Sequence, residues 1–274
     1  MAIVLINSLG ISQEIKENTK QTVVIEPKVK AAIAVVYPYL WRGIRYYGNK
    51  VAFQPNIEYS FTDKLRFNLW ATTNFSNAAD AYNEFDWSFC YQISPVVSVT
   101  MADYYWPASA NNSDWEKSSY FDYSEGSSQS MDLSLSFDFS EKGVPLRFEW
   151  NTFVAGNDFN YDANGKATTR AFSSYAELGY TYLHQKSGIG CSVFVGAVVI
   201  NGGYYGTDAN GQTGFTFSNI GVSIDKEIKI TKKFSLPVFI QYQNTDYGIR
   251  EFDSENGNKT TRNFFSCGMT FTVL

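Results

Sequence analysis

The chain has 274 residues, of which 44% are hydrophobic and 17% aromatic, and its formal net charge is −5 at pH 7. This length suits one or two soluble domains or one large barrel. The negative charge argues against a nucleic-acid partner, because phosphate binding requires a basic face. The longest apolar runs, such as Ala31–Tyr37, are far shorter than the ~20 residues of a membrane-spanning helix, which excludes a helical membrane protein.

The first residues have the character of an export signal. Ala2–Ser12 is an apolar run that ends in small residues, as a signal peptide does before its cleavage site. No basic region precedes it, so we interpret residues 1–12 as the remnant of a longer signal peptide; an ordinary apolar N-terminal segment is the alternative. We expect residues 13–30 to form a charged periplasmic lead-in and residues 31–274 to form one barrel domain.

Alternation with a period of two runs through most of the chain. It is clearest in Ser130–Ser140, where Met, Leu and Phe occupy the odd positions and Ser and Asp the even ones. A strand sends successive side chains to opposite faces, so this segment has one apolar and one polar face, which a helix could not provide. We expect twelve such strands: 31–42, 51–62, 65–75, 83–94, 96–106, 130–140, 145–155, 170–183, 189–200, 215–230, 234–246 and 262–274.

Short and long connections alternate between these strands. Tight turns such as Thr62–Lys64 and Glu141–Val144 follow the even-numbered strands, and longer polar loops follow the odd-numbered ones. This is the layout of an outer-membrane barrel, which has short periplasmic turns, longer outside loops and an even number of strands. Both termini would then lie on the periplasmic side, and the longest loops, Pro107–Gln129 and Tyr247–Thr261, would face the cell exterior.

The number of strands separates a membrane barrel from a soluble two-sheet sandwich. About eight closed strands make an interior that side chains can fill, whereas twelve leave a lumen too wide for a dry core. The apolar face should therefore meet lipid and the polar face a wet lumen. Tyr and Trp also gather near strand ends, at Tyr37–Trp41, Tyr104–Trp106 and Tyr204-Tyr205, as in an interfacial aromatic girdle. The expected fold is all-β, a transmembrane antiparallel up-and-down β-barrel.

Four short motifs occur in a familiar order, at Tyr39–Gly43, Gln54–Tyr59, Glu84–Asp86 and Asp103–Pro107. Over residues 39–107 their order and spacing resemble the TorF-type porin family of Gram-negative outer membranes, especially its Bacteroidetes-like branch. The resemblance implies an outer-membrane barrel and leaves the substrate open. Residues 268–274 resemble the C-terminal signal that the barrel-insertion machinery reads, with Leu274 in place of the usual terminal aromatic residue.

The sequence offers little for catalysis or metal binding. The one histidine, His184, falls in a predicted turn, where we expect it to be solvated. The three cysteines lie on different predicted strands without metal-site spacing: Cys90, Cys191 and Cys267. Asp132 and Asp138 share one strand face and could be read as catalytic carboxylates, but we interpret them as lining or structural charges. We expect no enzymatic activity, no cofactor and no metal.

The polar face carries charges of both signs. The predicted pore-lining residues are Arg42, Glu58, Arg66, Asp86, Asp132, Asp138, Arg147, Glu149 and Glu177. Such charges either set the field of a channel or close the interior through ion pairs. A four-residue turn at 141–144 would place Asp138 opposite Arg147, so we expect an ion pair there. Asp103 shares the parity of lipid-facing neighbours; a bulge near Ala102 or a position at the barrel rim would resolve this conflict.

These observations favour an outer-membrane pore for the passive diffusion of small hydrophilic solutes. Outer-membrane lipid and, during biogenesis, the barrel-insertion machinery are its expected partners. The alternative is a closed barrel with a structural or binding role through its outside loops. We expect a small conductance with at most a weak cation preference, because acidic residues outnumber basic ones in 107–129 while arginines line the lumen.

Overall fold

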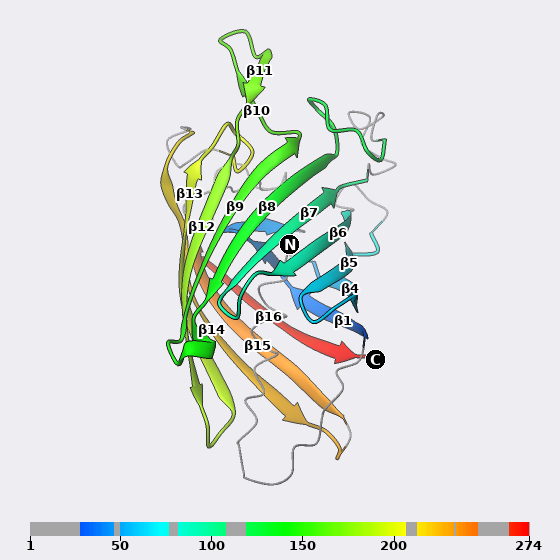
Figure 1. Ribbon diagram of the computed structural model, residues 1–274, viewed down its shortest axis with the longest axis vertical. Helices are drawn as coiled ribbons and strands as arrows, with labels where there is room; N and C mark the ends of the chain where they lie inside the picture. The colour runs from blue at the N-terminus through cyan, green and yellow to red at the C-terminus, as the bar shows by residue number, and fades with distance from the viewer. Residues whose placement is uncertain are drawn as a thin grey trace.

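The computed structural model describes residues 28–46, 50–76, 82–107, 119–206, 213–232, 234–245 and 263–273. Twelve antiparallel strands form a closed barrel in the order β1-β16-β15-β14-β13-β12-β9-β8-β7-β6-β5-β4 (Figure 1). Their bounds are β1 Val29–Tyr37, β4 Ala52–Ser60, β5 Leu65–Thr73, β6 Asn83–Gln92, β7 Val97–Tyr105, β8 Gln129–Asp138, β9 Leu146–Gly156, β12 Ser174–His184, β13 Ile189–Ile200, β14 Thr216–Lys229, β15 Ser235–Thr245 and β16 Asn263–Thr272. The predicted fold class and strand number are confirmed.

Two strand boundaries differ from the prediction by four or five residues, both because a short hairpin forms nearby, and the others agree within two residues. β1 ends at Tyr37 rather than Arg42, since β2 (Tyr39–Trp41) pairs with β3 (Ile44–Tyr46) in a separate sheet. β12 begins at Ser174 rather than Arg170, since β11 (Ala167–Arg170) pairs with β10 (Phe159–Tyr161). Tyr37, Tyr39 and Trp41 keep the odd-numbered apolar positions of β1, so the sequence pattern alone could not separate β2 from the barrel strand before it.

The two ends of the barrel differ in their connections. The short turns 61–64, 93–96, 139–145 and 185–188, and the short connection between β14 and β15, lie at one end, which we call the turn end. The longer connections lie at the other, the loop end, from which the β10–β11 hairpin projects (Figure 1). The turn at 139–145 contains the 3-10 helix Ser140–Lys142. In the described part of the chain, no helix is long and apolar enough to cross a membrane.

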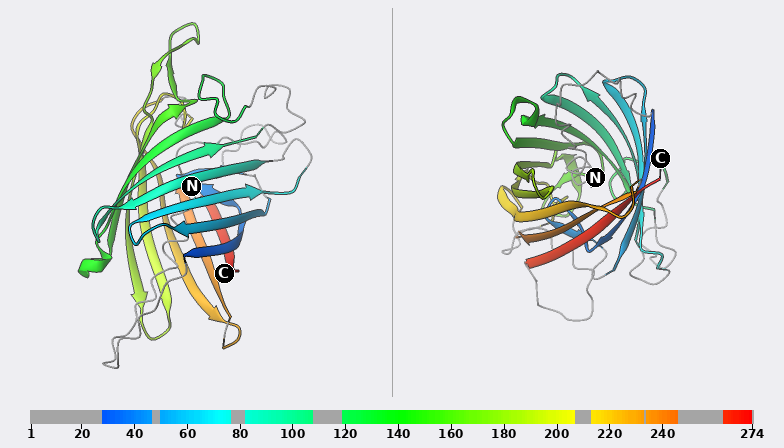
Figure 2. Two further views of the ribbon diagram at one scale, coloured as in Figure 1. Left: turned by 45° about the vertical axis from the view of Figure 1, so that its right-hand side comes forward. Right: turned by 90° about the horizontal axis from the view of Figure 1, so that it is seen from below.

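The barrel is polar inside and apolar outside. Its large exposed hydrophobic side chains include Ile57 on β4, Leu133 on β8, Leu178 on β12 and Ile240 on β15, whereas buried Ser, Asn, Gln and Asp side chains face the lumen. Figure 2 shows the strands enclosing this lumen from the turn end. Closure leaves no unpaired strand edge, which is the condition for a sheet to reside in lipid. The apolar outer face and the closed edge together meet the requirements of a barrel in lipid.

Asp103 keeps the outward parity expected from the sequence, and its position near the loop-end rim resolves the conflict. The register of β7 with β6 and β8 is continuous through Ala102, so no bulge turns Asp103 inward. The segment 119–128 folds over it instead: the Tyr123 hydroxyl and the Gln129 amide Nε2 each donate to its carboxylate at 2.6 Å. Asp103 is thereby fully buried.

Several predictions fall outside the described residues. These are the signal-peptide remnant at 1–12, most of the lead-in at 13–30, the whole of the last long loop at 247–261, and Leu274. They stay predictions.

Candidate functional site

A hairpin from the loop end folds into the lumen. In it, β2 and β3 pair Tyr39 with Tyr46 and Trp41 with Ile44, around a two-residue turn at Arg42-Gly43. Both turn residues have positive φ, +46° and +85°. Positive φ at both central positions is typical of a type I′ hairpin turn, for which glycine is favoured. The Arg-Gly pair thus makes the tight reversal that places the Arg42 side chain at the tip.

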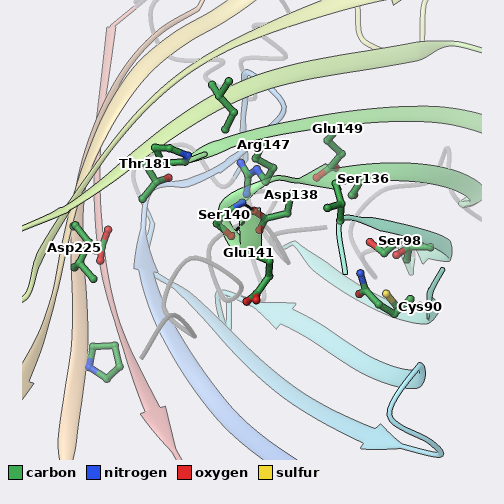
Figure 3. Close-up of a pocket in the computed structure, with 18 of the residues that line it drawn as sticks. Cys90, Ser98, Ser136, Asp138, Ser140, Glu141, Arg147, Glu149, Thr181 and Asp225 are labelled. Carbon is green, nitrogen blue, oxygen red and sulfur yellow. Dashed lines mark hydrogen bonds between the residues drawn. The ribbon is translucent and has the colours of Figure 1, made fainter. Parts of the chain in front are cut away.

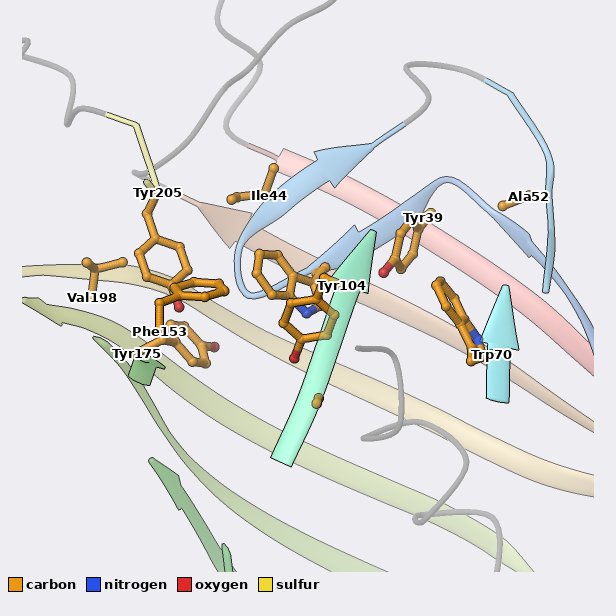
Figure 4. Close-up of a cluster of buried hydrophobic side chains, with 11 residues drawn as sticks. Tyr39, Ile44, Ala52, Trp70, Tyr104, Phe153, Tyr175, Val198 and Tyr205 are labelled. Atoms are coloured by element: carbon orange, nitrogen blue, oxygen red, sulfur yellow. The ribbon is translucent and has the colours of Figure 1, made fainter. Parts of the chain in front are cut away.

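Aromatic rings pack the hairpin against the inner wall (Figure 4). The Trp41 ring centroid lies 5.9 Å from that of Tyr104, 6.5 Å from that of Phe153 and 6.1 Å from that of Tyr205. Such ring pairs contribute about 0.5–1.5 kcal/mol each beyond the area they bury. The prediction that Tyr39, Trp41, Tyr104 and Tyr205 belong to an outer aromatic girdle is wrong, because all four are buried inside the barrel.

Arg42 is buried at the centre of this cluster. Its Nη1 donates to Asp132 Oδ2 at 2.8 Å and to the Tyr205 hydroxyl at 3.0 Å. Its guanidinium also lies 4.6 Å from the Trp41 ring centroid. Only 8% of the Arg42 side chain and none of the Asp132 side chain is exposed. Charge-assisted hydrogen bonds are roughly twice as strong as neutral ones, so Arg42 fastens the hairpin tip to β8.

A compact turn after β13 supplies Tyr205. The Asn201 side-chain carbonyl accepts from the backbone N–H of Gly203 at 2.9 Å and of Tyr205 at 3.3 Å, while its amide donates to the Gly206 carbonyl at 2.8 Å. These bonds direct Tyr205 inward. Burial raises the pKa of the Tyr205 hydroxyl, and its oxygen accepts the hydrogen bond from Arg42. In the sequence, Asn-Gly-Gly at 201–203 is the feature that indicates such a turn.

Below the hairpin, a cavity of about 1460 Å³ extends to the turn end; we call it the vestibule (Figure 3). It is lined by Arg42 toward the loop end and by Pro95, Gly143 and Gln185 at the turn end. Its basic lining residues are Arg42, Arg66, Arg147, Lys186, Lys226 and Lys229, and its acidic ones are Glu58, Asp138, Glu141, Glu149, Asp225 and Glu227. The formal charges therefore balance.

A second cavity of about 110 Å³ lies beside the hairpin tip. It is bounded by Trp41 and Arg42 on one side and by residues of β12–β15, among them Glu177, Asn219 and Gln243, on the other. The two cavities share Arg42, Arg147 and Glu149 as lining residues. The smaller cavity thus adjoins the vestibule beside the tip, between the hairpin and the wall, and we call it the side passage.

The predicted register of Asp138 with Arg147 is confirmed, but the ion pair expected between them is wrong. Arg147 Nη2 instead contacts Glu177 Oε1 on β12 at 3.0 Å. The Asp138 carboxylate accepts locally from the Ser140 backbone N–H at 2.9 Å and from its hydroxyl at 2.6 Å. Asp138 lies at the exposed turn end, where water weakens its attraction for Arg147. Glu177 is only 14% exposed, so its attraction for Arg147 is stronger.

The nine predicted pore-lining residues are in three settings. Six line the vestibule: Arg42, Glu58, Arg66, Asp138, Arg147 and Glu149. Glu177 lines the side passage. Asp86 and Asp132 lie on the lumen face of β6 and β8 and are fully buried. Arg42 belongs to the hairpin tip and not to a barrel strand. That these residues line a conducting path stays a prediction.

No family model and no curated protein matches the chain, so the resemblance to TorF-type porins and to their Bacteroidetes-like branch gains no support. Solved structures with a similar fold include a NanC porin (12% identity, 89% of this chain and 100% of that chain covered, TM-score 0.46). Others are Salmonella typhi OmpF (10%, 89% and 96%, 0.35) and Pseudomonas aeruginosa OprD (11%, 90% and 66%, 0.34).

Proposed function

We propose that the protein is a porin-like barrel of the outer membrane through which small hydrophilic solutes diffuse passively, with the β2–β3 hairpin narrowing the path. The proposal rests on the vestibule, a charged cavity of about 1460 Å³ inside a barrel whose outer face is apolar. Outer-membrane lipid would surround that face, and the barrel-insertion machinery would assemble the protein. Passive diffusion requires a wet lumen and no chemistry.

The hairpin favours a second candidate function, a closed barrel with a structural or binding role through its loops. The buried Arg42–Asp132 pair and the rings around it occupy the loop-end half of the lumen. Beside them lies the side passage, a cavity of about 110 Å³. The two functions differ in one property: whether ions cross the barrel while the hairpin lies in the lumen.

Single-channel recording in a planar bilayer distinguishes them. The native protein is compared with a variant in which residues 39–46 are replaced by a short Gly-Ser linker. Small current steps from the native protein, and several-fold larger steps from the variant, support a narrowed pore. Steps from the variant alone support the closed barrel. Absence of steps from both, with folding shown by circular dichroism, rejects a porin-like role.

A further inference from the structure

Asp86 is a buried carboxylate on the inner face of the barrel. It lies on the lumen face of β6 and is 0% exposed, and neither carboxylate oxygen has a hydrogen-bond partner among the described residues. The backbone N–H of Tyr105 is close to it but outside hydrogen-bonding geometry. An ionised carboxylate is costly to bury unless a cation or hydrogen-bond donors compensate it. Asp86 therefore marks a position where a positive group would be stabilised.

Aromatic rings surround this carboxylate. The register places Trp70 of β5 beside Asp86 on one side and Tyr104 of β7 on the other. Directly opposed side chains on one face of a sheet have Cβ atoms about 5 Å apart, so the two rings flank the carboxylate. Tyr39 of the hairpin lies 5.8 Å from Trp70, and Trp41 lies 5.9 Å from Tyr104, between ring centroids (Figure 4). We call these four rings and Asp86 the aromatic niche.

A second buried acid adds to the negative charge of the niche. Glu84, two residues before Asp86 on the same face of β6, is buried and accepts from the Tyr82 hydroxyl at 3.3 Å. Within the described residues, the ion pairs of the lumen use Asp132 and Glu177 and leave both acids of β6 without a basic side chain.

We propose that the aromatic niche binds an organic ammonium ion. Aromatic faces and carboxylates attract such a cation together, and aromatic cages recognise alkylated ammonium groups in this way. An inorganic cation fits less well: Ca²⁺ takes six to eight oxygen ligands, and no group of three or more His, Cys, Asp or Glu able to hold a metal occurs among the described residues. The ligand class is thus a small alkylammonium ion with one charge and an apolar body.

The niche adjoins the vestibule. Ser88, the next lumen-facing residue of β6 toward the turn end, lines the vestibule, as do Ala102 and Tyr104 of β7. The carboxylate therefore lies one lumen-facing residue beyond the vestibule lining on β6. The inference deepens the proposed function by naming a class of solute; it depends on that function for passage through the barrel but not for binding.

Binding is tested on the purified full-length protein in detergent at pH 7.5, by calorimetric titration with n-butylammonium chloride. Butan-1-ol serves as the uncharged ligand of similar shape. Asp86→Asn removes the charge of the niche, and Asp162→Asn makes the same change in the exposed turn of the β10–β11 hairpin. We expect saturable binding by the native protein and by Asp162→Asn, at least tenfold weaker binding by Asp86→Asn, and no saturation with butan-1-ol.

Two further variants keep the test decisive. If Asp86→Asn does not fold, Trp70→Leu removes one aromatic face and should also weaken binding at least several-fold, while Asp86→Glu should retain it. Unchanged affinity in a folded Asp86→Asn or Trp70→Leu, or no binding by the folded native protein, overturns the inference. Conductance is recorded on the same preparations. If the native protein gives current steps but does not bind butylammonium, only the ammonium site is rejected. If it binds butylammonium but gives no current steps, only the channel function is rejected.

Discussion

Replacing Arg42 by methionine tests whether charge seats the hairpin in the lumen. Methionine retains much of the side-chain volume but removes the 2.8 Å contact to Asp132 and the 3.0 Å hydrogen bond to Tyr205. Removing one partner of a buried ion pair costs about 3–5 kcal/mol, because the other charge is left uncompensated. Each 1.4 kcal/mol is a factor of ten in an equilibrium. The ratio of molecules with the hairpin inside the lumen to molecules with the hairpin outside it should therefore fall by roughly 10²–10⁴.

The assay combines current recording with unfolding. We expect Arg42→Met to give larger or more frequent current steps than the native protein. Urea unfolding followed by tryptophan fluorescence should show a loss of stability of up to about 3–5 kcal/mol, and less if the hairpin leaves the lumen before the barrel unfolds. Arg170→Met is the matched control, because Arg170 of β11 donates to the carbonyl of Gly156 at the end of β9 and does not belong to the cluster around Arg42.

A double-mutant cycle separates the ion pair from side-chain packing. Asp132→Asn alone leaves Arg42 buried without its counter-charge, whereas the double variant Arg42→Met/Asp132→Asn removes both charges. Coupled residues deviate from additivity by about 0.5–3 kcal/mol, so the double variant should be less destabilised than the sum of the two single variants. If Arg42→Met has native stability and native current, the charge of Arg42 does not hold the hairpin in the lumen. If the two single substitutions are strictly additive, the loss of stability comes from side-chain packing and not from the ion pair.

Three further results are expected. Gly156→Ala should destabilise the barrel by more than about 3 kcal/mol, because its φ of +92° is strained for alanine and the added Cβ collides with the Gln129 carbonyl and Ser130 Cα. Gly165→Ala, with a φ of +75° and open space around the Cβ, should cost far less, and equal costs in urea unfolding would contradict the clash. A cysteine at Ser119 should react with an impermeant maleimide on intact cells and one at Ser187 only after the outer membrane is broken; the reverse would invert the topology. The reversal potential in a salt gradient should show at most a weak cation preference, because the acidic and basic residues of the vestibule balance, and strong anion selectivity would contradict this.

The sequence alone determined the barrel strands and their facing. Side-chain direction along an extended backbone is a local property, so the alternation in Ser130–Ser140 was enough to place Leu133 outside and Asp132 inside. The turn at 141–144 was likewise local, and it fixed the register that joins Asp138 to Arg147. Strand number then followed from counting such segments between turns, as the closed barrel confirms.

Only the tertiary structure decided what fills the lumen. Aromatic residues at a strand end suit an outer girdle and an inner cluster equally well, and the sequence does not show that Trp41 turns inward to meet Tyr205, 164 residues later. The partner of Arg147 was undetermined for the same reason. Glu177 and Asp138 lie on opposite neighbouring strands, and the choice depended on burial, which exists only once the barrel has closed. Local pattern thus sets the wall of this protein, and contacts between distant segments set its interior.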